Sequence, residues 1–163
     1  MILPIRLWPD PVLRRVCAPV LVFDAALAQL AQDMLETMYV APGRGLAAPQ
    51  VGETARMFVM DVSWKDGAPN PVVCVNPVIL KSGEALKSGE EGCLSIPDTP
   101  MQITRPAAIT LAWKDVGGCA HRADLEGFAA TCAQHEIDHL NGMTILDRIA
   151  PDLRASLEAS LLA

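Results

Sequence analysis

The sequence lacks several features that mark whole classes of protein. No apolar run approaches the roughly 18–20 residues that a membrane-spanning helix needs. Residues 1–6 do not show a charged region followed by an apolar stretch, which is the pattern of a secretory signal peptide. Internal repeats and low-complexity segments are also missing. We therefore expect one globular domain over residues 1–163, located in the cytoplasm and without membrane contact.

A basic surface and a disulfide framework are missing as well. The chain has 13 Lys and Arg residues against 19 Asp and Glu residues, a formal net charge of −6. Proteins that bind nucleic acid usually carry a basic face, so we predict no direct nucleic-acid binding. The five cysteines are odd in number and irregularly spaced, which indicates reduced thiols. Hydrophobic residues make up 51% of the chain, which is enough for a buried core.

The most informative segment that is present is His-Glu-x-x-His, which begins at His135 and is a metal-hydrolase arrangement when it lies on a helix. On a helix, His139 lies about 40° round from His135 and one turn along, so both imidazoles point to the same side. Glu136 lies about 60° from His139, where its carboxylate can face a water molecule on the metal without being a ligand. A catalytic zinc-type site usually takes three protein ligands, so the rest of the chain must supply the third.

Hydrophobic periodicity places this motif on a central helix. Helices are predicted at residues 11–15, 25–39 and 128–140 and from 151 onward. Strands are predicted at residues 56–62, 72–76, 103–113 and 119–125, and Pro77 bends the second of them toward residues 78–80. A hairpin turn is predicted at 115–118, a polar segment at 81–91 and a short extended piece at 145–149. Hairpin-type connections favour an α+β fold, with antiparallel β-sheets packed around a central metal-binding helix and with an N-terminal and a C-terminal helix.

Two further segments are candidates for the rest of the site. Residues 41–52 are rich in glycine and proline and form a predicted loop, but no Gly-Lys-Ser/Thr follows, so it is not a phosphate loop. Cys93 allows three interpretations: a buried thiol, a nucleophile or a metal ligand. The histidine pair favours the ligand, because a thiolate binds Zn²⁺ and Fe²⁺ well. Cys119 and His121 also alternate on one face, but nothing nearby completes a metal site with them.

Three segments together closely resemble the signature motifs of peptide deformylases. Those motifs read Gly-x-Gly-Leu-Ala-Ala-x-Gln, Glu-Gly-Cys-Leu-Ser and Gln-His-Glu-x-Asp-His-Leu-x-Gly. Every defined position is present in the same order, at Gly43–Gln50, Glu91–Ser95 and Gln134–Gly142. The similarity runs from the Pro-Asp-Pro near the N-terminus to Leu-Asp-Arg at residues 146–148. His-Glu-x-x-His alone occurs in many unrelated zinc proteases, whereas all three motifs at compatible separations are specific.

The resemblance implies a metal-dependent hydrolase that removes the N-formyl group from the N-terminal formylmethionine of newly made proteins and releases formate. Cys93, His135 and His139 would hold one divalent ion, in this family commonly Fe²⁺, with Zn²⁺ or Ni²⁺ able to substitute. Such an ion lowers the pKa of a bound water molecule. Glu136 would take the proton of the water and later deliver it to the leaving amine.

The resemblance also assigns the groups that face the substrate. The side-chain amide of Gln50 and the backbone N–H of Leu94 would donate to the oxyanion. Gly45 has no side chain, so the peptide backbone could lie alongside its loop. The predicted substrate contacts are Gly43, Gly45, Glu91, Phe128, Thr131 and Cys132.

Two positions and the C-terminal tail depart from the family pattern. Asp98 stands where the family usually has glycine after Ser-Ile-Pro, and Thr131 stands where an apolar residue commonly lines the methionine pocket. The tail from Leu153 onward contains one basic residue, Arg154. Some relatives dock on ribosomal RNA through a longer, basic C-terminal helix. This tail lacks the charge for phosphate binding, so ribosome contact by that route is not supported.

The motif helix also predicts a buried ion pair. Asp138 points away from the metal side, at about −60° from His135. A buried carboxylate needs a partner, and Arg105 in the Thr-Arg-Pro stretch is our candidate.

Two other functions stay open at this point. One is a related metallo-amidase or peptidase with a different acyl substrate. The other is a non-catalytic paralogue that binds formylated peptides, although retention of Glu136 counts against it because a binding protein needs no general base. The sequence does not decide the native metal, the oligomeric state, the side-chain preference beyond methionine, or whether a second deformylase exists in the same cell.

Overall fold

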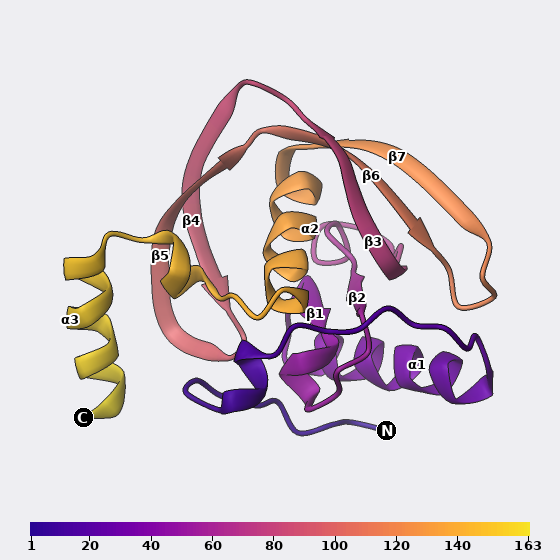
Figure 1. The fold of residues 1–163 in the computed structure, drawn as a ribbon, viewed down its shortest axis with the longest axis horizontal. Coiled ribbons are helices and arrows are strands. Elements are labelled where there is room, and N and C mark those ends of the chain that lie inside the picture. The colour runs from indigo at the N-terminus through magenta and orange to yellow at the C-terminus, as the bar shows by residue number, and fades with distance from the viewer.

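The computed structural model describes all residues from 1 to 163 (Figure 1). The α-helices are α1 (Ala25–Val40), α2 (Gly127–Leu140) and α3 (Pro151–Leu162), and the 3-10 helices are η1 (Pro11–Arg14), η2 (Ala48–Val51) and η3 (Ile145–Arg148). The strands are β1 (Gly45–Ala47), β2 (Met57–Met60), β3 (Val72–Ser82), β4 (Leu86–Cys93), β5 (Ile96–Pro106), β6 (Ala108–Lys114) and β7 (Ala120–Glu126).

The strands form two antiparallel sheets. A five-stranded sheet has the order β1-β2-β3-β6-β7, and β4 and β5 form a separate two-stranded sheet. Helix α2 stands between the two sheets, and α1 packs beside β1 and β2 (Figure 1). The predicted α+β fold with a central helix, an N-terminal helix and a C-terminal helix is therefore confirmed.

Three apolar clusters hold these layers together. The largest joins α2 to the five-stranded sheet around Phe58 and Leu111, which are fully buried. The second places the apolar stripe of α1, including Met34, against Val59 and its neighbours. The third lies between the β4–β5 hairpin and η3, around Ile103. Helix α2 is thus enclosed by sheet on two sides, and most of its residues from Ala130 to Leu140 are buried.

The C-terminal end of α2 is fixed by two contacts. Gly142 has a φ of +76°, and a Cβ atom there would lie 2.4 Å from the carbonyl oxygen of Arg14, so only glycine fits. Arg56 donates through Nη1 to the Leu140 carbonyl (3.1 Å) and through Nη2 to the Asn141 side chain (2.9 Å). The guanidinium thus satisfies carbonyl groups that a helix end leaves without an intrahelical partner.

Three of the predicted assignments are wrong. Residues 41–52 are not a loop throughout, because β1 and η2 lie within them. The polar segment 81–91 is mostly strand, because β3 continues to Ser82 and β4 begins at Leu86. The predicted strand at 103–113 in fact contains the end of β5 and most of β6, which belong to different sheets. Pro106 ends β5, and proline has no N–H with which to continue a ladder. The β4–β5 ribbon was missed because most of its β4 side chains are polar and exposed, so it shows no apolar alternation.

Residues 145–149 also differ from the prediction, since they form η3 and not an extended piece. Thr144 accepts a hydrogen bond from the Leu146 N–H through Oγ1 (3.2 Å), and Asp147 accepts one from the Thr144 N–H through Oδ2 (2.8 Å). This reciprocal capping closes a helical turn.

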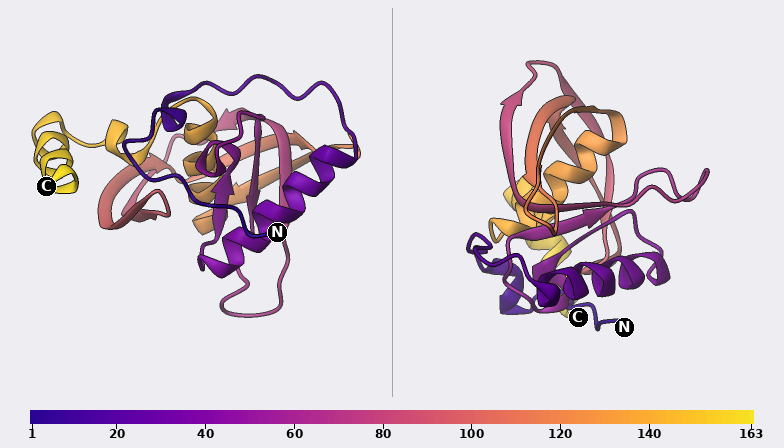
Figure 2. Two further views of the ribbon diagram at one scale, coloured as in Figure 1. Left: turned by 90° about the horizontal axis from the view of Figure 1, so that it is seen from below. Right: turned by 90° about the vertical axis from the view of Figure 1, so that its right-hand side faces the viewer.

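Helix α3 stands apart from the rest of the molecule, as Figure 2 shows. None of its residues is buried, although Leu157 and Leu161 pack against the third apolar cluster. No helix in the structure combines the length and the apolar character that a membrane crossing requires.

Candidate metal centre and active site

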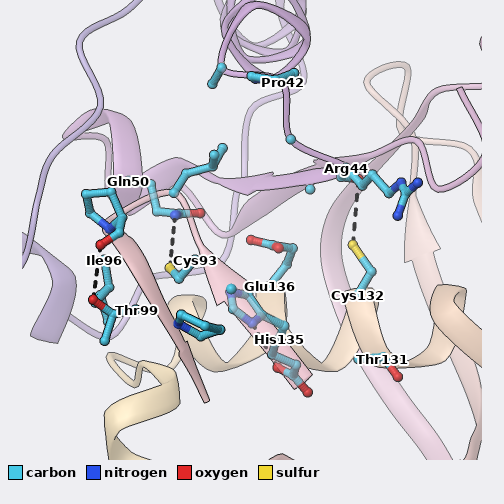
Figure 3. Close-up of a pocket in the computed structure, with 18 of the residues that line it drawn as sticks. Pro42, Arg44, Gln50, Cys93, Ile96, Thr99, Thr131, Cys132, His135 and Glu136 are labelled. Carbon is cyan, nitrogen blue, oxygen red and sulfur yellow. Dashed lines mark hydrogen bonds and ion pairs between the residues drawn. The ribbon is translucent and has the colours of Figure 1, made fainter. Parts of the chain in front are cut away.

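A cavity of about 570 Å³ opens where the three motif segments meet (Figure 3). Its walls contain all of the predicted site residues except His139, namely Gly43, Gly45, Gln50, Glu91, Cys93, Leu94, Phe128, Thr131, Cys132, His135 and Glu136. His139 is 1% exposed and lies behind this lining, next to Cys93. Segments that are far apart in the sequence are therefore brought to one place.

Cys93, His135 and His139 form the only group of side chains in the structure that could hold a metal ion. Their donor atoms all lie within 4.8 Å of one another, and Sγ of Cys93 is 3.4 Å from Nε2 of His139. Donors bound to one tetrahedral ion at about 2.0–2.3 Å lie roughly 3.5 Å apart, so small movements bring all three onto one ion. One thiolate and two imidazoles suit Zn²⁺ or Fe²⁺, and the residues present therefore fit a single divalent metal.

A buried carboxylate fixes the imidazole of His135. Oε1 of Glu91 lies 3.1 Å from Nδ1 of His135, which leaves Nε2 of that ring available as a ligand atom. Arg105 donates to the same carboxylate through Nε (2.7 Å) and Nη2 (2.9 Å). Burial alone would raise the pKa of Glu91, but the hydrogen bonds from His135 and Arg105 outweigh it and lower the pKa to about 2. Glu91 is thus ionised at neutral pH.

The predicted pair of Arg105 and Asp138 is confirmed. Nη1 of Arg105 donates to Oδ2 of Asp138 at 2.9 Å, and both side chains are buried. A second arginine, which the sequence did not suggest, binds the same carboxylate. Arg148 donates through Nε to Oδ2 (2.5 Å) and through Nη2 to Oδ1 (2.7 Å). The only sequence signal for Arg148 is its place in the Leu-Asp-Arg segment that follows the third motif.

Glu136 has a different environment from the other carboxylates. It is 4% exposed, and its Oε1 atom has no hydrogen-bond partner. Burial raises the pKa of Glu136 to about 7, and the positive charges of His135 and Arg105 only partly oppose this effect. The carboxyl is therefore able to hold or release a proton near neutral pH.

Gly45 makes room for this carboxylate. A Cβ atom on Gly45 would lie 2.6 Å from Oε2 of Glu136 and 2.7 Å from Sγ of Cys132, closer than real Cβ contacts. The sequence interpretation gave Gly45 a role beside the substrate backbone. The structure adds that its own neighbours already fill the space of a side chain.

The side chain of Gln50 is held in one orientation. Its Oε1 atom accepts a hydrogen bond from the Ala47 N–H (2.9 Å), and its Nε2 donates to Oγ of Ser95 (3.1 Å). Nε2 also lies 3.6 Å from Sγ of Cys93. The sequence interpretation gave Ser95 no role, and its signal was its defined position in the second motif.

The alternative pair of Cys119 and His121 forms no metal site. Nε2 of His121 lies 2.8 Å from Oδ2 of Asp115, and its ring stacks on Trp113. The pair is exposed and belongs to the end of the β6–β7 hairpin.

The comparisons with known proteins agree with this geometry. The family model described as polypeptide deformylase matches residues 2–155. The chain belongs to the peptide deformylase family. A peptide deformylase of Mesorhizobium japonicum is 51% identical over 147 residues, which cover 90% of this chain and 84% of the relative. A peptide deformylase of Rhizobium meliloti is 50% identical over the same shares of both chains.

Solved structures of peptide deformylases match the fold. That of Legionella pneumophila has a TM-score of 0.92 and 40% identity, and the match covers 99% of this chain and 94% of the other. That of Thermotoga maritima has a TM-score of 0.87 and 45% identity, with coverage of 93% and 99%. The chain is accordingly a metal-dependent hydrolase that removes the N-formyl group from the N-terminal formylmethionine of newly made proteins. Neither a different acyl substrate nor a non-catalytic role is favoured.

One departure from the deformylase pattern has a backbone explanation. Asp98 has a φ of +57°, in the left-handed region that glycine enters without strain. Aspartate is one of the few other residues that visit this region, so the loop keeps its turn without glycine. Thr131 lies in the cavity wall, as Phe128 does, so its side chain brings a hydroxyl group to the lining of the cavity.

Proposed function

We propose that Cys93, His135 and His139 hold one divalent ion, Fe²⁺ in the native enzyme, with Zn²⁺ or Ni²⁺ able to substitute. When bound, such an ion acidifies a water molecule and polarises the formyl carbonyl. The observation that carries the proposal is the placement of the three donor atoms, within 4.8 Å of one another and beside a cavity that also receives Glu136. The substrates are nascent peptides that begin with N-formylmethionine.

Glu136 is the proposed general base and acid. Its carboxylate takes a proton from the water whose oxygen attacks the formyl carbon, and it gives that proton to the nitrogen as the C–N bond breaks. Formate and a free methionyl amine result. A pKa of about 7 suits both directions of transfer, and the unpartnered Oε1 atom is free to accept the proton.

Gln50 and Leu94 are the proposed donors to the oxyanion, through Nε2 of the side chain and through the backbone N–H. Ala47 and Ser95 hold the amide of Gln50 in place before the substrate arrives. A donor that needs no reorientation stabilises the developing charge at the smallest cost.

The substrate peptide lies along the Gly43–Gly45 edge in our proposal, and its methionine side chain enters the part of the cavity walled by Phe128, Thr131 and Cys132. Both oxygens of Glu91 already bind Arg105, and Oε1 also faces His135. We therefore propose that Glu91, which the sequence interpretation placed among the substrate contacts, orients the imidazole.

The setting of the reaction is also proposed. Residues 1–163 act as one catalytic domain on nascent chains in the cytoplasm. We do not propose ribosome docking through α3, because its one basic side chain, Arg154, already pairs with Asp147 and Glu158. The charge needed to bind RNA phosphates is absent from that helix.

The decisive test measures formate release from formyl-Met-Ala-Ser by protein purified anaerobically with Fe²⁺, beside an acetyl-Met-Ala-Ser control. Release from the formyl peptide alone is the expected result. No formate above that of a Glu136→Ala variant would refute the proposed function, and equal cleavage of both peptides would favour a broader amidase. Iron as the native metal would be supported if the Fe²⁺ form loses activity in air while Cys93 is oxidised and the Zn²⁺ form keeps its activity under the same conditions.

A further inference from the structure

We infer that Arg148 is a positioning residue for His135, acting through Asp138, Arg105 and Glu91. The inference rests on the ligand set proposed above. It assigns a role at the metal centre to a side chain of η3, which is outside the three motifs and does not line the cavity.

The four side chains form an unbroken line of charge-assisted contacts. Arg148 binds both oxygens of Asp138 (2.5 and 2.7 Å), and Asp138 accepts from Nη1 of Arg105 (2.9 Å). Arg105 binds both oxygens of Glu91 (2.7 and 2.9 Å), and Glu91 faces Nδ1 of His135 (3.1 Å). The Arg148 side chain is 36% exposed, whereas the side chains of Asp138, Arg105, Glu91 and His135 are only 3–9% exposed.

The charge balance explains why Arg148 is needed. Asp138 and Glu91 are two buried carboxylates, and Arg105 is the one buried guanidinium between them. Arg105 uses two N–H groups on Glu91 and one on Asp138, so Asp138 depends on Arg148 for its second positive charge. Without Arg148, Asp138 would compete with Glu91 for Arg105, because a buried charge that loses its partner is costly. Glu91 would then lose the contacts that hold it against His135.

The segment that carries Arg148 is firmly anchored. Ile145 and Leu146 are buried in the third apolar cluster, and Thr144 and Asp147 cap the turn. The guanidinium is therefore presented from a fixed backbone, and its loss would reach His135 through Asp138, Arg105 and Glu91. Substitution of a residue that orients a metal-binding imidazole commonly lowers metal affinity by about 10–100-fold.

The test compares Arg148→Met with Arg154→Met. Arg154 is a matched control, since its side chain is 37% exposed, close to the 36% of Arg148, it is likewise held in ion pairs, with Asp147 and Glu158, and it makes no contact with the network. Both variants and the wild type are loaded with Co²⁺. The visible absorption spectrum and the rate of metal release to a chelator are then measured, together with kcat and KM.

We expect Arg148→Met to release metal about 10-fold faster than Arg154→Met, with an altered cobalt spectrum and a lower kcat at an unchanged KM. Equal release rates and identical spectra in the two variants would overturn the inference. Should Arg148→Met fail to fold, Arg148→Lys is compared with Arg154→Lys. One ammonium group cannot bind both oxygens of Asp138 as the fork does, so faster release from Arg148→Lys supports the inference and equal release refutes it.

The same experiment separates this inference from the proposed function. A wild type that binds no stoichiometric Co²⁺, or a Cys93→Ala variant that keeps it unchanged, would refute the ligand set and the inference with it. Normal metal binding in the wild type, with no difference between the variants at 148 and 154, would refute the inference alone.

Discussion

Helix α2 carries two buried carboxylates, on different sides, and their hydrogen-bonding environments are opposite. Glu136 and Asp138 are two residues apart and almost equally buried, at 4% and 6% exposed. Asp138 receives three hydrogen bonds from two arginines, whereas Oε1 of Glu136 receives none. One side of the helix therefore holds a carboxylate that is bound by two guanidinium groups. The other side holds a carboxyl group whose pKa is raised to about 7, near neutral pH.

The difference shows that burial by itself does not decide what a carboxylate does. An ionised carboxylate without a partner is costly inside a protein, and its pKa rises until the proton is kept. Paired with guanidinium groups, the same carboxylate becomes part of the scaffold. In the proposed mechanism, the carboxylate that exchanges a proton and the carboxylate that is paired with guanidinium groups are thus two different side chains of one helix.

The largest expected effect comes from removing the charge on the unpaired side. Glu136→Gln should lower deformylase activity by about 10²–10⁴-fold, because the glutamine amide cannot take up the proton of the water and deliver it to the leaving amine. Formate release measures this loss, with metal content as the control. An active Glu136→Gln variant would show that Asp138 and Glu136 do not differ in the way proposed.

The same variant should fold more stably without metal. The folded-state pKa of Glu136, about 7, lies above the ordinary value of 4.5, so folding favours the protonated form. The resulting stability is complete below about pH 4.5 and is lost as the pH rises through about 7. At about pH 8 the wild type is therefore destabilised by about 3 kcal/mol relative to the Gln variant, and the difference vanishes near pH 4.5. Urea unfolding at both pH values measures it.

Removing the charge on the paired side should cost stability. Arg105→Met leaves Glu91 without its guanidinium and Asp138 with Arg148 alone, so we expect a loss of about 3–5 kcal/mol in the free energy of unfolding. Urea unfolding of the metal-free protein gives the value. Arg154→Met, which removes only exposed ion pairs, should cost less than about 1 kcal/mol. A normal melting temperature and normal metal content in Arg105→Met would contradict the proposed role of the network.

The pH dependence of stability should also distinguish Glu91, which is bound by Arg105, from Glu136, which is not. The pKa of Glu91 is lowered from 4.5 to about 2, so its contribution is present above about pH 4.5 and is lost as the pH falls through about 2. The lowered pKa corresponds to about 3 kcal/mol in the free energy of unfolding. The ionised form of Glu91 stabilises the fold, whereas the ionised form of Glu136 destabilises it. Urea unfolding of metal-free wild type between about pH 5 and pH 2 should show this loss, and Glu91→Gln should not. Parallel pH profiles would exclude an ionised Glu91 in the folded protein.

The smallest effect is expected at an exposed carboxylate that is neither buried nor in an arginine pair. Asp98→Gly should stabilise the protein by about 0.5–1 kcal/mol, because glycine adopts a positive φ without steric cost. Asp98→Ala should destabilise it by a similar amount, and both variants should keep deformylase activity within about twofold. Thermal unfolding measures the difference. If Gly and Ala have the same effect, the conformation at 98 is not what limits stability.

The sequence alone predicted the motif helix within one residue at its start, since a regular apolar pattern and a glycine stop are local signals. It also predicted the partner of Asp138, because helix geometry shows which side a residue faces and a buried carboxylate requires a cation. The family resemblance predicted that Cys93, Gln50 and Leu94 belong to one site, but it gave no distances between them.

Other features depend on contacts between residues that are far apart in the sequence, and only the tertiary structure shows them. The two strands within 103–113 are separated because they pair with different partners, and local propensity does not report partners. Likewise, the steric need for Gly45 comes from Glu136 and Cys132, which lie on another element. Arg148 shows the same limit, since no periodicity indicates that η3 folds back against Asp138. Sequence pattern thus determined the chemistry available to this protein. Packing decided which of two neighbouring carboxylates is paired with guanidinium groups and which one has an oxygen without a partner.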